Sequence, residues 1–158
     1  MIKRRGLKPS SFGTLKRKGG RVRLRSQKTK KRSKEKSISK LTKECDRLFS
    51  IKVRGIRPEH PNEYGCCYTC GHITQKKKLQ CSHYLSRYYK AARWNFDNAR
   101  PACFMCNIWK KGDLVNFRQR LMAEIGEARV LAVEAKRNDS IKLSRDYLKN
   151  LRISLLYE

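Results

Sequence analysis

Two short stretches decide the fold of this chain: Cys67-Tyr68-Thr69-Cys70 and Cys103-Phe104-Met105-Cys106, which enclose the 32 residues 71–102. Two pairs of cysteines at this spacing are typical of a zinc site closed by four thiolates, although the pairs lie further apart than in the commonest zinc ribbons. A site of this kind has no open coordination position and is structural. We therefore expect Zn2+ to hold together a loop-rich segment that lacks a large apolar core, with the ligands Cys67, Cys70, Cys103 and Cys106.

The three other cysteines need a separate interpretation, because the total of seven is odd. Cys66 competes with Cys67 for the ligand role, but only Cys67 gives the two-residue spacing to Cys70. Cys45 and Cys81 are expected to be small apolar core residues. No apolar leader follows the basic N-terminus, so we expect reduced thiols that bind metal in a cytoplasmic protein rather than disulfides.

The chain is strongly basic. It carries 40 Lys and Arg against 13 Asp and Glu, which gives a net charge of +27 over 158 residues. A free compact protein with this excess would repel itself, so a polyanionic partner is expected. Nucleic acid is favoured over a membrane, because the sequence contains no apolar run long enough to span a bilayer.

The positive charge is concentrated near the start of the chain. Seventeen of the Lys and Arg lie in residues 1–40, beside a single acidic residue, Glu35. This segment is also rich in Ser and Gly and poor in large apolar side chains, so it cannot bury enough surface to offset the entropy of ordering. We expect a disordered basic arm over residues 1–37 that contacts phosphates, and the alternative is a solvated tail without a binding role.

Hydrophobic periodicity places helices on both sides of the cysteine-bracketed segment. Apolar residues recur at helical spacing over 38–52, and again over 114–136 with an interruption at Gly126. A last amphipathic helix is expected after the turn and cap signal of residues 138–140. We expect these apolar stripes to form an ordinary core, and the alternative is that the terminal helix packs against a second copy of the chain.

The bracketed segment is expected to contain short strands and loops. Residues 73–74 and 79–85 look like a short hairpin, and residues 86–97 look like an irregular basic loop. The predicted fold class is therefore α+β, a small zinc-stapled core flanked by α-helices. Its expected parts are the basic arm over 1–37, a helix and linker over 38–62, the zinc-bound core over 63–126 and C-terminal helices over 127–158.

Three polar side chains in and beside the bracket indicate phosphodiester chemistry. His83 falls on a predicted strand, where a neutral imidazole would take a proton from the water that attacks phosphorus. The amide of Asn98 would either accept the ring N–H of His83 or pin the loop. Asn107 would begin a helix and turn its carbonyl oxygen toward a hard cation such as Mg2+. Each residue alone is more often structural, and their joint placement is what favours a nuclease.

These residues resemble those of the HNH, or ββα-metal, endonucleases, and more closely those of the phage recombination protein family NinG, also called Rap. The resemblance covers about residues 64–128. It is carried by Cys67-Tyr68-Thr69-Cys70-Gly71, Ser82-His83-Tyr84, Arg93-Trp94-Asn95, Asn98, Cys103-Phe104-Met105-Cys106-Asn107, Lys110 or Lys111, Gly112 and Leu114-Val115. The zinc and metal arrangement is also similar to that of phage endonuclease VII.

The resemblance implies an HNH-like core and a metal-dependent, structure-selective endodeoxyribonuclease that cleaves Holliday junctions and branched recombination intermediates. His83 would be the general base, Asn98 the residue that shapes the loop, and Asn107 a ligand of the catalytic Mg2+ or Mn2+. A phage origin would place the protein in the cytoplasm of the bacterial host.

One position departs from endonuclease VII, in which an Asp precedes the catalytic His and binds the metal. This chain has Ser82 there, and a Ser hydroxyl is a poor ligand. Either fewer protein groups and more water hold the metal, or Asp97, Asp113 or a backbone carbonyl completes its coordination.

Cations and aromatic residues near the proposed catalytic set are expected to contact DNA: Arg87, Lys90, Arg93, Lys110, Lys111, Tyr88 and Tyr89. The cations would follow phosphates and the tyrosines would stack on bases exposed at a branch. Trp94 and Phe96 are expected to pack in the core instead. A homodimer would place one active site at each of the two cleavage points of a four-way junction.

Two other functions remain open from the sequence. One is a generic HNH nickase that acts on duplex DNA, and the other is a non-catalytic zinc module that binds DNA or RNA. The basic composition suits the zinc module equally well, but mere binding does not need His83, Asn98 and Asn107.

Overall fold

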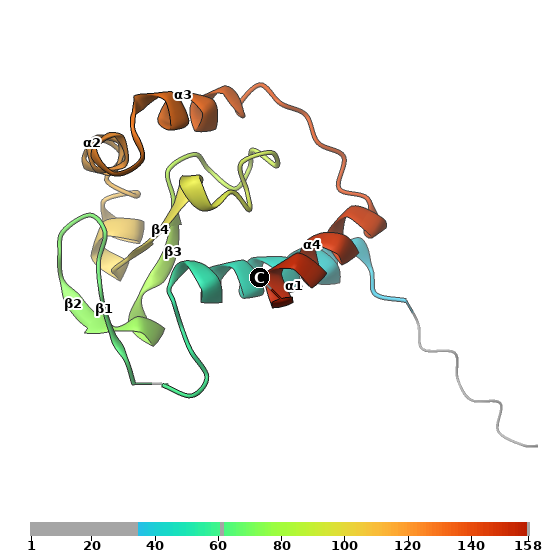
Figure 1. The fold of residues 1–158 in the computed structure, drawn as a ribbon, viewed down its shortest axis with the longest axis horizontal. Helices are drawn as coiled ribbons and strands as arrows, with labels where there is room; N and C mark the ends of the chain where they lie inside the picture. The colour runs from blue at the N-terminus through green and yellow to red at the C-terminus, as the bar shows by residue number, and fades with distance from the viewer. Residues whose placement is uncertain (1–34, 61, 158) are drawn as a thin grey trace, which may run out of the picture. The chain divides into compact units, whose positions relative to one another are not determined.

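The computed structural model describes residues 35–60 and 62–157, which form a mixed α+β structure (Figure 1). The expected basic arm falls almost entirely on residues outside these ranges. In chain order the elements are α1 (Ile38–Val53), β1 (Tyr64–Cys66), β2 (Ile73–Gln75), η1 (Lys76–Lys78), β3 (Gln80–His83), η2 (Phe96–Asn98), β4 (Ala99–Ala102), η3 (Met105–Trp109), α2 (Leu114–Ile125), α3 (Glu127–Ala135) and α4 (Arg145–Tyr157). Among the described helices, none combines the length and apolarity needed to cross a membrane.

Helices α1 and α4 pack against each other and form the largest apolar cluster (Figure 1). Leu41, Cys45 and Phe49 recur every four residues on the buried face of α1, which is the spacing that predicted this helix. The Ser37 side chain accepts a hydrogen bond from the backbone N–H of Lys40 and caps the helix. The predicted helix over 38–52 and the core role of Cys45 are confirmed.

The start of the last helix differs from the prediction. Residues 141–144 are not helical, and α4 begins at Arg145. The cap is Ser144, whose hydroxyl accepts a hydrogen bond from the backbone N–H of Tyr147 at 3.1 Å. The turn signal at 138–140 ends the preceding helical region instead, since Asn138 and Asp139 donate backbone hydrogen bonds to Ala135 and Lys136.

The predicted hairpin between residues 73–74 and 79–85 is wrong. Strand β2 pairs with β1, and β3 pairs with β4, so that the structure has two separate antiparallel pairs. The first pair sets Cys66 opposite Ile73, and the second sets His83 opposite Ala99. The reason is local, because the three lysines of η1 form a turn that ends β2 before Leu79, the first buried residue on the way into β3.

Strand β4 leads directly into η3, so the order is strand, strand, helix. Element η3 is a π-helix, and the backbone N–H of Lys110 donates to the carbonyl of Met105 five residues earlier at 3.0 Å. After Lys110, the next three residues have left-handed backbones, with φ of 50° at Lys111, 90° at Gly112 and 48° at Asp113. Helix α2 begins after them.

Helices α2 and α3 form a second layer over the loop between β3 and β4 (Figure 1). Gly126 has φ of 82° and separates them, as the interrupted periodicity predicted. Phe117, Leu121 and Val130 are buried between the two helices. Val133 packs instead on Leu85 of the loop.

Candidate functional site

The four cysteines of the two pairs meet in one cluster. The sulfurs of Cys67, Cys70, Cys103 and Cys106 all lie within 4.8 Å of one another, and those of Cys70 and Cys103 are 3.8 Å apart. A tetrahedron with Zn–S bonds of about 2.3 Å has edges of about 3.8 Å, whereas a disulfide needs about 2.05 Å. The donor set and its spacing therefore fit a structural zinc site.

The local backbone explains why Cys67, rather than Cys66, belongs to the cluster. Gly71 adopts φ of 76°, and its N–H donates to the carbonyl of Cys67 at 2.9 Å in a tight knuckle turn. The Cys66 side chain is exposed, and its sulfur faces the carbonyl of Gly71 at 3.2 Å. Burial opposes ionisation of Cys67, but hydrogen bonds from the backbones of Cys103, Cys70 and Thr69 lower the pKa of this thiol to about 6.

Replacement of Cys103 by Ser is expected to abolish zinc binding and to unfold the segment around the two strand pairs, because metal binding and folding are coupled. Zinc content and near-UV circular dichroism of the purified variant measure both effects. Cys66→Ser is the matched control and is expected to retain one zinc per chain. Equal loss of zinc in the two variants would contradict the ligand assignment.

His83 and Asn107 face a common cavity of about 330 Å³, although they come from β3 and η3. Asp46, Arg54 and Arg87 are also among its lining residues. A neighbouring hollow of about 320 Å³ again includes His83, Asn107 and Arg87. The two side chains singled out from the sequence are thus brought together at one surface of the protein.

His83 is held in one tautomer by its neighbours. Its Nε2 lies 3.0 Å from the backbone carbonyl of Arg93, and since a carbonyl can only accept, Nε2 carries the proton and Nδ1 keeps a lone pair. Burial lowers the pKa of His83; the hydrogen bond to the carbonyl of Arg93 opposes this change, and the positive charge of Arg87 adds to it. The imidazole is therefore neutral near pH 7 and able to act as a base.

Asn107 directly follows the last cysteine and is oriented by Gln80. Its Nδ2 donates to Oε1 of Gln80 at 2.6 Å. Among the described residues no donor is paired with Oδ1 of Asn107, so this oxygen is left as a ligand atom. An amide oxygen is suited to a hard divalent cation.

Asn98 is fully buried and is engaged with the backbone of the loop. Its Oδ1 accepts from the N–H of Leu85 at 2.7 Å, and its Nδ2 donates to the carbonyls of Leu85 and Ala92 at 2.8 and 2.9 Å. Of the two roles that the sequence left open, these contacts are those of a residue that pins the loop. The carbonyl of Arg93, which orients His83, directly follows this pinned region.

Replacement of Asn98 by Ala is expected to lower the free energy of unfolding by about 3 kcal/mol, because it leaves buried backbone groups of Leu85 and Ala92 without partners. Urea denaturation of the zinc-loaded protein measures this change. The control Asn116→Ala removes an exposed amide that bonds only Asp113 and should cost less than about 0.5 kcal/mol. Similar values for the two variants would contradict the structural role of Asn98.

Asp46 is a site residue that sequence reasoning missed. Its carboxylate accepts hydrogen bonds from Nε and Nη2 of Arg93 at 2.9 and 2.6 Å and from Nε1 of Trp94 at 3.0 Å. It thereby fixes the residue whose carbonyl orients His83. No local pattern predicts it, because Asp46 lies on α1, 47 residues before its partner Arg93.

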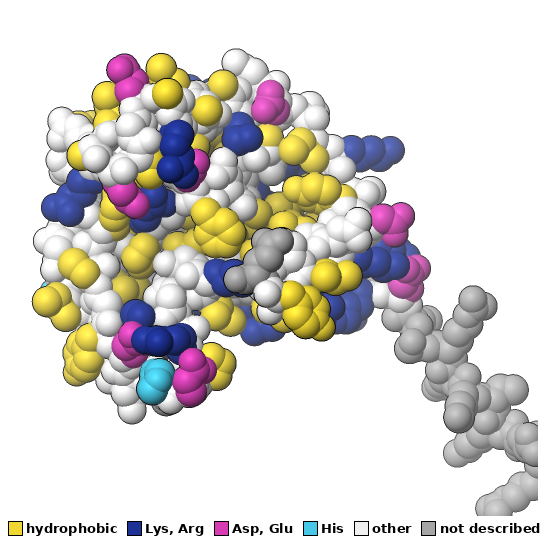
Figure 2. Space-filling model, viewed as in Figure 1, with side chains coloured by type: hydrophobic (Ala, Val, Ile, Leu, Met, Phe, Trp, Pro, Cys, Tyr) yellow, Lys and Arg dark blue, Asp and Glu magenta, His cyan; other side chains and the backbone are white. Residues whose placement is uncertain are grey.

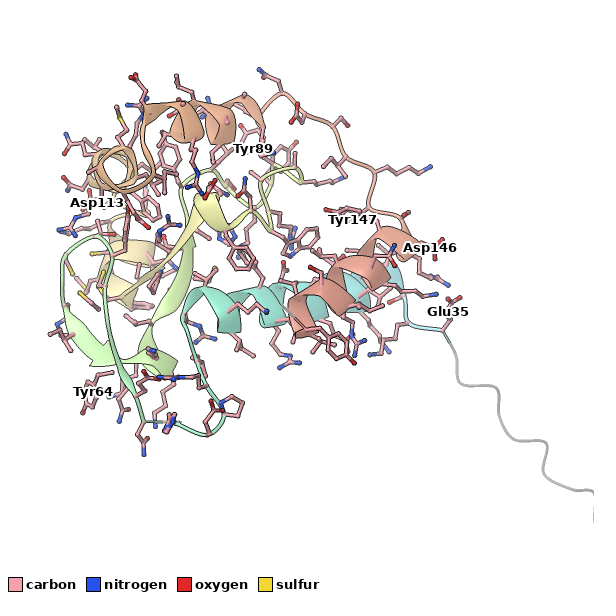
Figure 3. The ribbon with its side chains drawn as sticks, viewed as in Figure 1. Glu35, Tyr64, Tyr89, Asp113, Asp146 and Tyr147 are labelled. Atoms are coloured by element: carbon pink, nitrogen blue, oxygen red, sulfur yellow. The ribbon has the colours of Figure 1, made fainter. Side chains whose placement is uncertain are left out.

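Asp97 and Asp113, the two acids considered as second ligands of the catalytic metal, do not line the cavity. Asp97 pairs with Arg129, and Asp113 accepts from the side chain of Asn116 beside the start of α2 (Figure 3). Neither lines the cavity, and nor does Ser82, whose hydroxyl is buried without a hydrogen-bond partner among the described residues. Asp46 supplies the one carboxylate among the described residues that line the cavity.

Of the seven residues expected to contact DNA, five are exposed and two are engaged in contacts within the protein. Arg87 lines both hollows and Lys111 lines the second, and Lys90, Lys110 and Tyr88 are exposed on the surface. Arg93 is committed to Asp46, so a phosphate would have to displace that carboxylate. Tyr89 is half-buried against α3 with the guanidinium of Arg137 over its ring (Figure 3).

The core prediction for the two other loop aromatics is correct for Trp94 and wrong for Phe96. Trp94 is 9% exposed and joins the α1–α4 cluster. Phe96 is half-exposed because only one face of its ring packs, on Phe49 with the ring centres 4.9 Å apart.

Together, the fold and the cysteine cluster define a small mixed α+β protein with a site of the structural zinc type. The chain matches the family model described as Bacteriophage Lambda NinG protein over residues 3–157. It therefore belongs to the NinG family, and the match extends well beyond the residues that carried the resemblance. Neither the curated proteins nor the solved structures include a match to this chain.

Proposed function

We propose that this protein is a metal-dependent, structure-selective endodeoxyribonuclease that cleaves Holliday junctions and other branched recombination intermediates. The observation that carries the proposal is the shared cavity of His83 and Asn107, with Arg87 on its wall. A structural zinc module needs no such cavity, and a module that only binds nucleic acid needs no neutral, half-buried imidazole. Membership of the NinG family also supports the proposed nuclease function.

The order of elements around the cavity, strand, strand and helix, supports the proposal of an HNH-like core. His83 ends β3, β4 returns beside it, and Asn107 lies on the helix η3 that follows. The thiolates of Cys103 and Cys106 anchor the start of this helix to the first knuckle. The imidazole of His83 and the carboxamide of Asn107 line one cavity, which supports the proposal.

The residues present support hydrolysis of a phosphodiester by an activated water. Nδ1 of His83 takes a proton from the water while the carbonyl of Arg93 holds the ring N–H, and this role requires the neutral form that burial favours. Phe49 packs 5.9 Å from the imidazole and limits its movement. Arg87 would bind the scissile phosphate and stabilise the charge that develops on it.

The donor set at Asn107 fits a hard cation that is held largely by water and by phosphate oxygens, as is common for Mg2+. Asn107 would hold Mg2+ or Mn2+ through Oδ1, and Gln80 fixes that oxygen by binding the amide nitrogen. Such a cation, when bound, supplies charge stabilisation at the leaving oxygen.

Affinity for DNA would come from the positive charge, and selectivity from the shape of the branch. Arg87 and Lys111 lie at the hollows, Lys110 precedes Lys111 in the chain, and Lys90 is exposed; these side chains would follow the phosphate backbone. A two-fold dimer would present two such sites to the two cleavage points of a junction.

Replacement of His83 by Ala is expected to lower the cleavage rate about 10²- to 10⁴-fold, the usual contribution of a general base, and to leave junction binding intact. Gels with labelled four-way junction, duplex and single strand, each with Mg2+ or EDTA, measure both properties. The control His60→Ala changes an exposed histidine outside the cavity and should retain full activity.

The same gels separate the competing functions. Paired nicks in the junction alone support the proposal, whereas equal cutting of duplex would indicate a generic nickase. Binding without cutting under every metal tried would indicate a non-catalytic zinc module. Loss of both binding and cleavage in His83→Ala would make His83 a structural residue.

The cleavage rate of the wild-type protein is expected to fall in acid with a midpoint below pH 6.5, the ordinary pKa of histidine. The direction follows from burial, which lowers the pKa of His83 and keeps Nδ1 free of a proton until the solution is more acidic. A series of single-turnover rates between about pH 5 and pH 8 measures the midpoint, with junction binding followed over the same range. A midpoint above 6.5 would contradict the assignment.

A further inference from the structure

Six large apolar side chains are exposed within the twelve residues 104–115, which we term the exposed segment: Phe104, Met105, Ile108, Trp109, Leu114 and Val115. Single exposed apolar residues are ordinary, but a contiguous group marks an interaction site. Trp109 is the largest of them and is 71% exposed. On the face drawn in Figure 2, apolar side chains likewise lie exposed beside Lys and Arg.

The backbone of this segment is held in costly conformations. It contains the π-helix η3 and then the left-handed residues Lys111 and Asp113, which carry side chains. Gly112 between them is buried, and a Cβ there would lie 3.3 Å from the side chain of Leu114. Such departures persist where the surrounding structure enforces them, and they cluster at functional sites.

The exposed segment forms part of the rim of the cavity. Ile108 lines both hollows together with His83 and Asn107, and Leu114 lines the second. Trp109 follows Ile108 in the chain. An apolar ligand surface that meets Trp109 would therefore lie next to whatever occupies the cavity.

The charge of the exposed segment indicates which kind of partner binds to it. The exposed segment contains Lys110 and Lys111 and one acidic residue, Asp113, whose carboxylate accepts hydrogen bonds from the side chain of Asn116. In a two-fold dimer the same patch would meet itself, so these like charges would face one another. A polyanion with accessible flat apolar faces is complementary to both the charge and the aromatic surface, and nucleic acid with unstacked bases is such a partner.

We infer that Trp109 and its apolar neighbours stack on bases unpaired at a DNA branch point and so make binding selective for branched over continuous duplex DNA. This inference rests on the proposed function for the identity of the substrate. In this inference the exposed segment recognises branched DNA and takes no part in hydrolysis. Lys110 and Lys111 contact the phosphates. The duplex interior offers no free base faces to this surface.

The test compares affinity for a four-way junction and for a duplex of the same arms, in EDTA so that nothing is cleaved. In Trp109→Ala the ratio of junction to duplex affinity is expected to fall about 5- to 150-fold, the usual effect of removing one base-stacking aromatic side chain. Trp109→Phe keeps an aromatic face and should retain most of the preference. Tyr157→Ala removes an 85% exposed aromatic residue from α4 and should change nothing.

Fluorescence provides a direct readout of the contact. The chain has two tryptophans, and since Trp94 is buried, Trp109 dominates quenching by acrylamide. The junction is expected to shield Trp109 from acrylamide more than the duplex does, with Trp109→Phe giving the Trp94 background. Zinc content and the Trp94 signal establish that each variant is folded.

Several outcomes would overturn the inference. These are an unchanged affinity ratio in Trp109→Ala, no preference for the junction in the wild type, or shielding of Trp109 by higher protein concentration alone, which indicates self-association. Shielding by phosphatidylcholine–phosphatidylglycerol vesicles but not by DNA would assign the segment to a lipid surface. Base stacking by Trp109 without cleavage under any metal would support this inference and contradict the proposed nuclease function. Cleavage together with an unchanged ratio of junction to duplex affinity in Trp109→Ala would support the nuclease function and contradict this inference.

Discussion

The meeting of four thiols is the constraint on which the site depends. The strand pairs have only three and four residues in each strand, and strands this short are not stable by themselves in water. The cysteine cluster ties the first knuckle to the turn after β4, and the N–H of Tyr68 reinforces this link by donating to the carbonyl of Pro101 at 2.8 Å. Asn107 is placed beside β3 because its neighbour Cys106 is part of the cluster.

A second support comes from the opposite wall of the cavity. Helix α1 contributes Asp46 and Phe49 to this wall, and α4 packs against α1 in the same apolar cluster as Phe49. The guanidinium of Arg93 then joins the loop to α1, while the buried amide of Asn98 holds the rest of the loop in place. His83 is therefore oriented by contacts from parts of the chain far apart in sequence, and loosening either wall would move it.

The sequence predicted what depends on short-range patterns. The Cys-x-x-Cys spacing identified the four clustered thiols, and apolar periodicity identified α1 and the break at Gly126. It did not predict that β3 pairs with β4, because that pairing depends on where η1 ends β2 and on a loop that Asn98 must close. The role of Asp46 could not be predicted either, because the sequence around an Asp in a helix does not indicate a partner 47 residues away. Ser144 as the cap of α4 was missed because residues 138–140 gave a stronger turn signal.

Ser82 does not line the cavity, whose lining is cationic. Alternation along β3 turns Cys81 and His83 to the cavity and Ser82 to the buried side, so position 82 contributes no ligand from this strand. Among the described residues, Asp46 is the one carboxylate on the wall and is neutralised by Arg93, and Arg54 and Arg87 leave the lining cationic. A cationic lining favours entry of a phosphate, and the field of Arg87 also opposes a proton on His83. Burial is the main cause of the lowered pKa of His83, and the charge of Arg87, which would attract the substrate, adds to it.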